Sequence, residues 1–114
     1  MRVSLQKDSW DDESLLELFF DLTRTEKAIL GSVDRRSKKS ANDLADELGK
    51  DVTTIQRNLK SLKDKELVTR EKQSINGGGY HYTYQKASKE TLQTKMLLTL
   101  EEFQENVLKK IKRI

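Results

Sequence analysis

Two short amphipathic segments, joined by a turn of three residues, constrain the fold of this chain more than any other feature. In the first, residues 41–48, the apolar side chains recur on one side of a helix, with Ser40 placed to cap its start. Gly49 suits a left-handed C-terminal cap, and Asp51 suits the N-cap of the second segment, residues 51–65. Two helices joined by such a turn form a helix-turn-helix, whose second helix enters the major groove of DNA.

The second helix has two distinct sides. Its apolar residues Val52, Ile55, Leu59 and Leu62 follow spacings of three, four and three, which form a narrow stripe for a core. A rotation of about 100° per residue puts Arg57 nearly opposite that stripe. This outward side could contact a nucleic-acid groove or could simply be solvated. The candidate base-contacting residues are Thr53, Thr54, Gln56, Arg57 and Lys60.

The net charge of +3 is unevenly distributed over the 114 residues. Residues 1–22 hold two basic and six acidic side chains, so the rest of the chain carries about +7, and a polyanion would bind there. Basic residues are frequent in the loop that precedes the first of the two helices, although a merely solvated loop explains them equally well. The candidate phosphate contacts are Arg35, Arg36, Lys38, Lys39, Ser40, Lys50 and Lys72.

Residues 67–86 predict a β-hairpin. The segment "LVTREKQ" has strand propensity, "SINGGG" is a flexible turn, and "YHYTYQK" alternates three tyrosines with His81 and Thr83. We expect the tyrosines to cover the core or a neighbouring helix. The triple glycine lacks the Gly-Lys-Ser/Thr ending of a phosphate-binding loop and does not open a helix, so it does not indicate nucleotide binding.

Helices are also expected on both sides of this core. One spans about 10–20, with Asp8 or Ser9 as its N-cap, and a second spans 24–33, with Thr23 and Glu26 at the spacing of a capping box. A third spans 88–114 from an N-cap at Ser88. The outer two carry more apolar surface than one small core can cover, which favours a dimer over binding of the basic C-terminus to a membrane surface. The alternatives are that helix 10–20 packs under its own domain and that helix 88–114 is a long packing arm. The candidate interface residues are Leu15, Phe19, Phe20, Met96, Leu100, Phe103, Val107 and Ile111.

Catalysis is not indicated by this composition. The chain has one histidine and no cysteine, and its acidic residues fall at helix starts or solvated positions, so neither a nucleophile with its base nor a metal site is expected. No cofactor is expected. The N-terminus lacks the apolar stretch of a signal peptide, and no apolar run is long enough to span a membrane. We therefore expect a cytoplasmic protein.

The stretch from "LTRTEKAIL" through "SANDLADELGKDVTTIQRNLKSLKDKELVTREK" to "GGGYHYTY", about residues 22–86, resembles the winged helix-turn-helix domains of MarR and TrmB-type transcriptional regulators, especially archaeal ones. The apolar pattern that continues into "LKDKELVTR" carries the resemblance, although Glu66 stands where these families usually have glycine. The wing lacks the arginine that many members place in the minor groove; Lys72, Asn76 and His81 are its substitutes here. By the resemblance, helices 10–20 and 88–114 are dimerisation elements.

The predicted fold is therefore α+β and mainly α: one domain over 1–114, with a winged helix-turn-helix core at 22–86, an added N-terminal helix and a long C-terminal dimerisation helix. The predicted function is a homodimeric, sequence-specific regulator that binds double-stranded DNA. The alternative is a winged-helix module that docks onto proteins of a transcription complex without reading DNA. RNA binding is less favoured, because the stacking motifs of common RNA-binding modules are missing. A small-molecule effector is left open.

Overall fold

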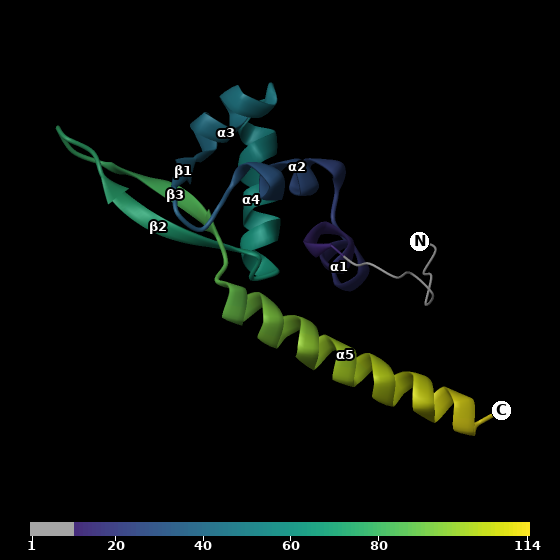
Figure 1. Cartoon of the computed structure of the whole chain (residues 1–114). Coiled ribbons are helices and arrows are strands. Elements are labelled where there is room, and N and C mark those ends of the chain that lie inside the picture. The colour runs from purple at the N-terminus through teal and green to yellow at the C-terminus, as the bar shows by residue number, and fades with distance from the viewer. Residues whose placement is uncertain (1–10) are drawn as a thin grey trace. The chain divides into compact units, whose positions relative to one another are not determined.

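The computed structural model describes residues 11–114, which form five α-helices and three β-strands (Figure 1). Contacts divide the chain into two compact units, and each is described by itself. One unit spans residues 22–92; the other combines the described N-terminal residues up to Asp21 with residues 93–114. The expectation of a single domain over the whole chain stays a prediction.

The unit of residues 22–92 is a winged helix-turn-helix, as predicted. Its strands form one antiparallel sheet in the order β1-β3-β2, and the hairpin of β2 and β3 projects away from the helices (Figure 1). The expected helix bounds are confirmed to within one residue. The elements in chain order are α2 (Arg24–Ser32), β1 (Lys39–Ser40), α3 (Ala41–Leu48), α4 (Val52–Asp64), β2 (Val68–Ser74) and β3 (Tyr80–Lys86).

The apolar stripe of α4 lies in the core of this unit. Ile55, Leu59 and Leu62 are fully buried, together with Ile29 of α2 and Leu44 of α3. Truncation of such side chains to alanine typically costs about 2–5 kcal/mol, so this packing fixes the rotation of α4 about its own axis. The side of the helix that faces outward is therefore determined by the core.

The helix starts follow the expected capping residues. Thr23 and Glu26 form a capping box at α2, and Ser40 and Asp43 form another at α3. Gly49 has φ 62°, the left-handed conformation that ends α3, and the Asp51 carboxylate accepts hydrogen bonds from the backbone N–H groups of Thr53 and Thr54. These caps explain why the turn between the two helices has three residues.

Glu26 has a second role that the sequence did not reveal. Its side chain is 1% exposed and accepts hydrogen bonds from Ser61 Oγ at 3.0 Å and from Lys65 Nζ at 2.9 Å, in addition to the Thr23 N–H at 2.9 Å. Burial raises the pKa of this carboxyl, but the hydrogen bonds from Thr23, Lys65 and Ser61 outweigh it and hold the pKa below its usual value. The ionised carboxylate thus ties the start of α2 to the last turns of α4.

The end of α4 places Glu66 in a conformation that favours glycine. Its φ is 63°, while the Glu66 N–H donates to the Lys63 carbonyl and the Leu67 N–H donates to the Leu62 carbonyl. This is the Schellman arrangement, in which the left-handed position is usually glycine. Glu66, which stands where the resembling families usually have glycine, therefore carries a Cβ in a strained conformation.

Replacement of Glu66 by glycine should stabilise the protein. The left-handed conformation costs a residue with a Cβ about 1–2 kcal/mol, and the greater freedom of unfolded glycine offsets part of that, which leaves a gain of roughly 0.5–1 kcal/mol. Urea unfolding of Glu66→Gly measures it. Glu66→Ala is the matched control, because alanine removes the same carboxylate but keeps the Cβ that strains the left-handed conformation. A lower stability for Glu66→Gly than for the wild type would refute the strain.

The second unit contains α1 (Asp12–Phe19) and most of α5 (Lys89–Lys112). The N-cap of α1 is Asp11, whose carboxylate accepts the Ser14 N–H at 2.7 Å; the expected caps Asp8 and Ser9 lie outside the described residues. Ser88 caps α5 as expected, with its Oγ accepting the Thr91 N–H at 3.1 Å.

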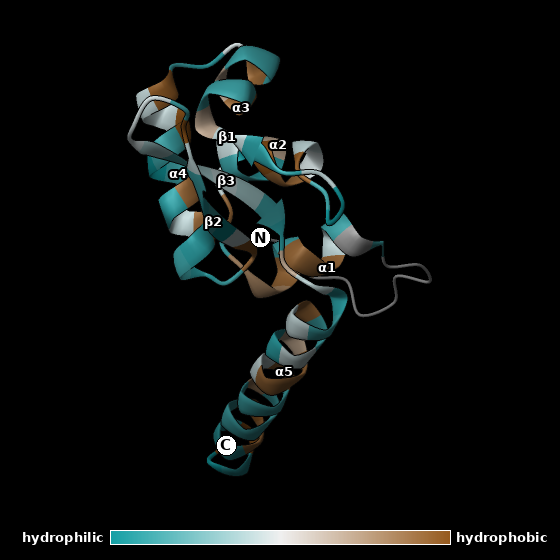
Figure 2. Ribbon diagram, turned by 90° about the vertical axis from the view of Figure 1, so that its left-hand side faces the viewer, coloured by the Kyte–Doolittle hydropathy of each residue, from teal (hydrophilic) through white to brown (hydrophobic). Residues whose placement is uncertain are grey.

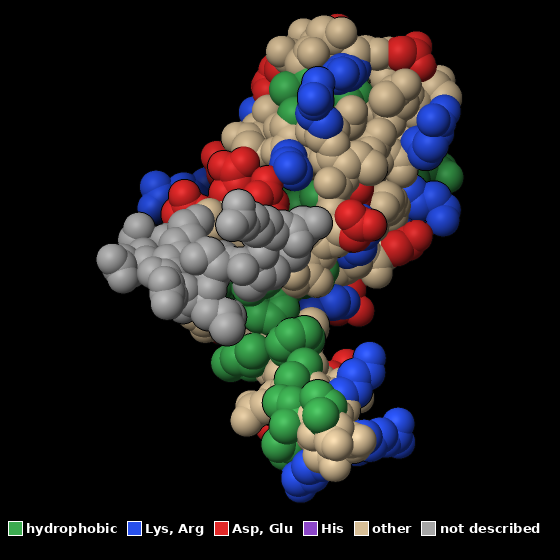
Figure 3. Space-filling view, turned by 90° about the vertical axis from the view of Figure 1, so that its right-hand side faces the viewer, with side chains coloured by type: hydrophobic (Ala, Val, Ile, Leu, Met, Phe, Trp, Pro, Cys, Tyr) green, Lys and Arg blue, Asp and Glu red, His purple; other side chains and the backbone are tan. Residues whose placement is uncertain are grey.

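Apolar side chains recur along α5 as far as the C-terminus (Figure 2), and those beyond Leu92 are largely exposed. Figure 3 shows hydrophobic side chains gathered on the surface of this helix. The large exposed ones are Leu97, Leu98, Leu100, Phe103, Val107, Leu108, Ile111 and Ile114. Met96 of α5 and Leu15, Phe19 and Phe20 of the N-terminal segment are half-buried.

Candidate nucleic-acid interface

The outward side of α4 carries the predicted base-contacting residues. Thr53, Gln56, Arg57 and Lys60 are exposed, and Thr54 is half-buried. Lys60 pairs with Asp64 one turn later at 3.3 Å, an exposed ion pair that contributes little to stability. Within residues 11–114, the guanidinium of Arg57 makes no ion pair or hydrogen bond. Arg57 thus presents its full set of donors on the side of α4 opposite the buried stripe.

The basic loop between α2 and β1 is organised by Asp34. Its carboxylate accepts the backbone N–H groups of Ser37 at 2.6 Å and Arg36 at 2.8 Å, and these hydrogen bonds hold the pKa of Asp34 below its usual value. The neighbouring Arg35 donates from Nε to the Ala87 carbonyl at 2.9 Å and accepts from Gln85 on its own carbonyl. Arg35 therefore joins this loop to the end of β3, a structural role that the sequence did not indicate.

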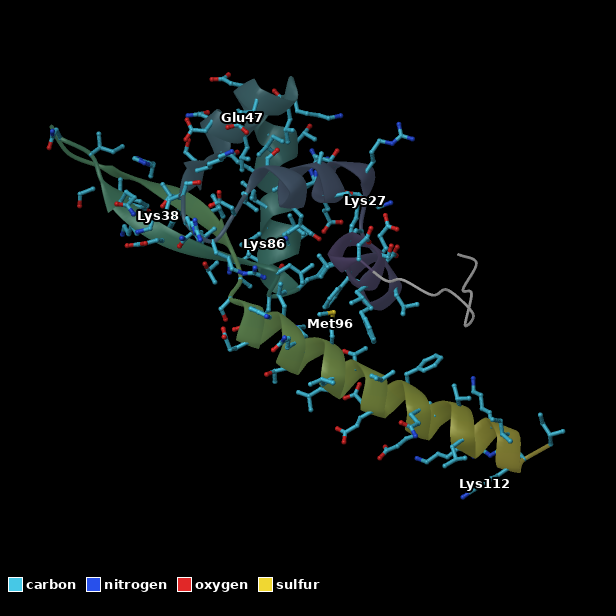
Figure 4. The ribbon with its side chains drawn as sticks, in the orientation of Figure 1. Lys27, Lys38, Glu47, Lys86, Met96 and Lys112 are labelled. Atoms are coloured by element: carbon cyan, nitrogen blue, oxygen red, sulfur yellow. The ribbon has the colours of Figure 1, made fainter. Side chains whose placement is uncertain are left out.

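Carboxylates neutralise two other candidates of the loop. Lys38 pairs with Glu71 of β2, and Figure 4 shows Lys38 beside the hairpin. Lys39 pairs with Glu47 at 3.0 Å and also donates to the Ser32 carbonyl at 2.7 Å. By contrast, Arg36 and Lys50 are exposed and have no ion pair among the residues that the structure describes. The candidate phosphate contacts thus differ in how much positive charge they offer.

The hairpin carries the remaining candidates. Gly77, Gly78 and Gly79 all have positive φ in its turn, beside Asn76. Along β3 the tyrosines become steadily more exposed toward the turn: Tyr84 is buried, Tyr82 is half-buried and Tyr80 is 51% exposed. The inner end of the row therefore covers the core, as expected, and the outer end is exposed.

An open cleft of about 380 Å³ lies between the two helices of the motif and the hairpin. Gln56 of α4 and Ser40, Ala41 and Asn42 at the start of α3 line it on one side. Residues of β3 line the other side: Tyr80, His81, Tyr82 and Tyr84. The structure thus brings together Gln56, Ser40 and His81, which were proposed from three separate segments.

Two cations of β2 lie over tyrosine rings of β3. The Arg70 guanidinium carbon is 4.0 Å from the centroid of the Tyr82 ring, and Lys72 Nζ is 3.7 Å from that of Tyr80. Arg70 was not among the sequence candidates. Its alternation with Lys72 on one strand, opposite alternating tyrosines on the next, is the signal that could have identified it.

Neither a metal site nor a membrane span is found in the part of the chain that the structure describes. No group of three or more His, Asp or Glu side chains there could hold a metal ion. No helix among these residues is both long and apolar enough to cross a membrane.

The fold and this surface define a winged-helix protein. Comparisons with known proteins show which proteins it is similar to. Residues 20–74 match the model of the MarR family. Over 106 residues the chain is 26% identical to an uncharacterized protein of Methanocaldococcus jannaschii, which covers 93% of this chain and 80% of that protein.

Solved structures share the fold. A possible transcriptional regulator from Methanosarcina mazei Go1 superimposes with a TM-score of 0.81 at 23% identity, covering 97% of this chain and 94% of its own. S. aureus MepR, in a complex with DNA, superimposes with a TM-score of 0.55 at 19% identity, covering 89% of this chain and 86% of its own. These likenesses show a winged-helix fold, and residues 20–74 are similar to the MarR family.

Proposed function

We propose that the protein is a homodimeric transcriptional regulator that binds double-stranded DNA with α4 in the major groove. The observation that carries this proposal is the division of α4 into a fully buried stripe and an exposed polar side with an unpaired Arg57. MepR, a structural neighbour, was solved in complex with DNA, which supports the same use of this fold. Such a regulator would act in the cytoplasm, where prokaryotic DNA lies.

In this proposal the exposed residues of α4 contact bases, and the surrounding cations contact phosphates. Thr53, Thr54, Gln56, Arg57 and Lys60 are the base contacts. Arg36, Lys50 and Lys72 are the principal phosphate contacts, with Asn76 and His81 contributing from the hairpin. Lys38 and Lys39 would have to exchange a carboxylate for a phosphate, so we expect smaller contributions from them.

The exposed apolar side chains of α5 support the homodimer. Leu100 is 47% exposed and Phe103 is 64% exposed within a single chain. Burial of the exposed part of such side chains against a second copy would contribute about 1–2 kcal/mol each. We propose that α1 supplies Leu15, Phe19 and Phe20 to the same interface. Two α4 helices would then read half-sites roughly 34 Å apart, one turn of DNA.

A protein-docking module without DNA binding is the second candidate. The neutralisation of Lys38, Lys39 and Lys60 by neighbouring carboxylates favours it, because these pairs reduce the positive charge that faces a polyanion. Salt dependence separates the two functions, since phosphate contacts release counterions from DNA and protein docking does not.

Neutralising Arg36, Lys50 and Lys72 by glutamine should weaken binding to every duplex alike. The slope of log K against log salt is negative, and each lost phosphate contact should make it shallower by about 0.9 per protomer. Fluorescence anisotropy of the full chain on a labelled duplex, measured over a salt series, gives the slope. The variant with Lys109, Lys110 and Lys112 replaced by glutamine removes the same charge from the end of α5 and should keep the wild-type slope. Equal slopes for the wild type, the Arg36/Lys50/Lys72 variant and the α5 variant would contradict the proposed phosphate contacts.

A further inference from the structure

The hairpin holds two cations without cancelling their charge. Arg70 and Lys72 lie over the rings of Tyr82 and Tyr80, and those two rings contact each other edge to face, with centroids 5.5 Å apart and an angle of 74°. A cation over an aromatic face is attracted by the ring quadrupole and keeps its full charge. Lys38 and Lys39, in contrast, are held by carboxylates that neutralise them.

The strand register shows where these cations are directed. Arg70 pairs directly with Tyr84 and Lys72 pairs directly with Tyr82, yet each cation contacts the next tyrosine toward the hairpin turn. Both side chains therefore lean toward the outer end of the hairpin, across diagonal neighbours. The same cation–tyrosine contact therefore occurs twice in a row on one face of β2, whereas the ion pairs elsewhere on this surface are isolated.

The two faces of the hairpin differ in charge. Because side chains alternate along a strand, Arg70 and Lys72 share a face with the tyrosines, and Glu71 lies on the other. No acidic residue of β2 or β3 lies on the tyrosine face. The tyrosines of this same face line the cleft that Gln56 of α4 borders. The tyrosine face of the hairpin thus adjoins Gln56 of α4, and Arg70 lines a second hollow with Lys63 and Glu66 at the end of α4.

We propose that Tyr80 and Tyr82 are positioning residues that orient Lys72 and Arg70 for contact with DNA phosphates, which adds Arg70 to the interface. The inference rests on the proposed DNA-binding function. A long cation normally loses rotamer freedom when it binds. Because the rings already restrict Arg70 and Lys72 before binding, less of that freedom is lost, and the charge remains available for the phosphate.

The geometry can be tested without DNA. In wild-type protein, the ring currents of the tyrosines should shift the Lys72 Hε and Arg70 Hδ resonances upfield of those of Lys50 and Arg36. Tyr80→Leu and Tyr82→Leu should remove these shifts, and Tyr80→Phe and Tyr82→Phe should keep them, because phenylalanine retains the ring. Unshifted resonances in the wild-type protein would overturn the inference.

A double-mutant cycle on duplex DNA tests the consequence. Each Tyr→Leu change should weaken binding about two- to fivefold at an unchanged salt slope, because only the cost of ordering the cation changes. Arg70→Gln and Lys72→Gln should each make the negative slope shallower by about 0.9 per protomer, because a phosphate contact is lost. In the Arg70→Gln background, Tyr82→Leu should have no further effect, since the side chain that it positions is gone.

The outcomes separate this inference from the function on which it rests. Salt-dependent binding with full additivity in the cycle would make the tyrosines merely structural and overturn the inference alone. Equal losses for Tyr→Phe and Tyr→Leu would assign the effect to the hydroxyl and overturn it as well. Wild-type protein that binds no duplex, even with intact ring-current shifts, would overturn the proposed function together with the inference.

Discussion

Glutamate at both Leu100 and Phe103 is expected to convert the proposed dimer into monomers. Both side chains are about half exposed or more in a single chain, and they lie on one stripe of α5. Only the exposed part of each side chain is newly buried, so loss of two side chains from each of two protomers would remove about 3–7 kcal/mol of association free energy, and the new carboxylates would oppose burial further. Dissociation at micromolar concentration follows.

Light scattering of Leu100→Glu/Phe103→Glu measures this change, with circular dichroism to show that the helices persist. Leu98→Glu is the matched control. Leu98 is 56% exposed, but about 100° per residue puts it on the opposite side of α5 from that stripe, so the dimer should survive. A wild-type protein that is itself monomeric at these concentrations would contradict the proposed assembly.

Replacement of Arg57 by alanine is expected to lower affinity for the specific DNA site roughly ten- to hundredfold. The guanidinium fork can pair with both major-groove acceptors of guanine, a contact worth about 1–3 kcal/mol. Because Arg57 lies opposite the buried Ile55 and Leu59, its truncation should leave folding intact. Random duplex should lose only the small, uniform share of affinity that one charge supplies.

Arg57→Lys is the matched variant, because it retains the charge and removes the fork. Its affinity for the specific site should fall more than its affinity for random duplex, as titrations of both DNAs will show. Equal losses on the two DNAs would mean that Arg57 contacts phosphate only. Unchanged affinity on both would leave the outward side of α4 as a solvated surface.

Local patterns predicted the helix-turn-helix almost completely. Spacing of apolar residues located α4, and short-range capping signals at Thr23, Ser40 and Asp51 located the helix starts, because these interactions join residues at most four positions apart. The left-handed Gly49 was predictable for the same reason. The strain at Glu66 was visible through the resemblance to families that carry glycine at this position.

Interactions between residues far apart in the chain could not be predicted from the sequence. Nothing local shows that Glu26 will meet Lys65, 39 residues later, or that Arg35 will donate to Ala87. The basic residues looked equivalent in sequence, yet the fold neutralises Lys38 with Glu71 and sets Lys72 over an aromatic ring. Whether a cation is available to a phosphate depends on such tertiary partners. The candidate site was therefore less predictable from the sequence than the fold was.

Sequence-selective binding by α4 is tested most directly by a comparison of two duplexes. One is the sequence that the full-length protein selects from random DNA, and the other is the same sequence scrambled, titrated at equal salt. We expect the selected duplex to bind at least about 10³-fold more tightly, and Arg57→Ala to reduce that ratio by roughly ten- to hundredfold. Equal affinity of the wild-type protein for the two duplexes would contradict sequence recognition by this helix.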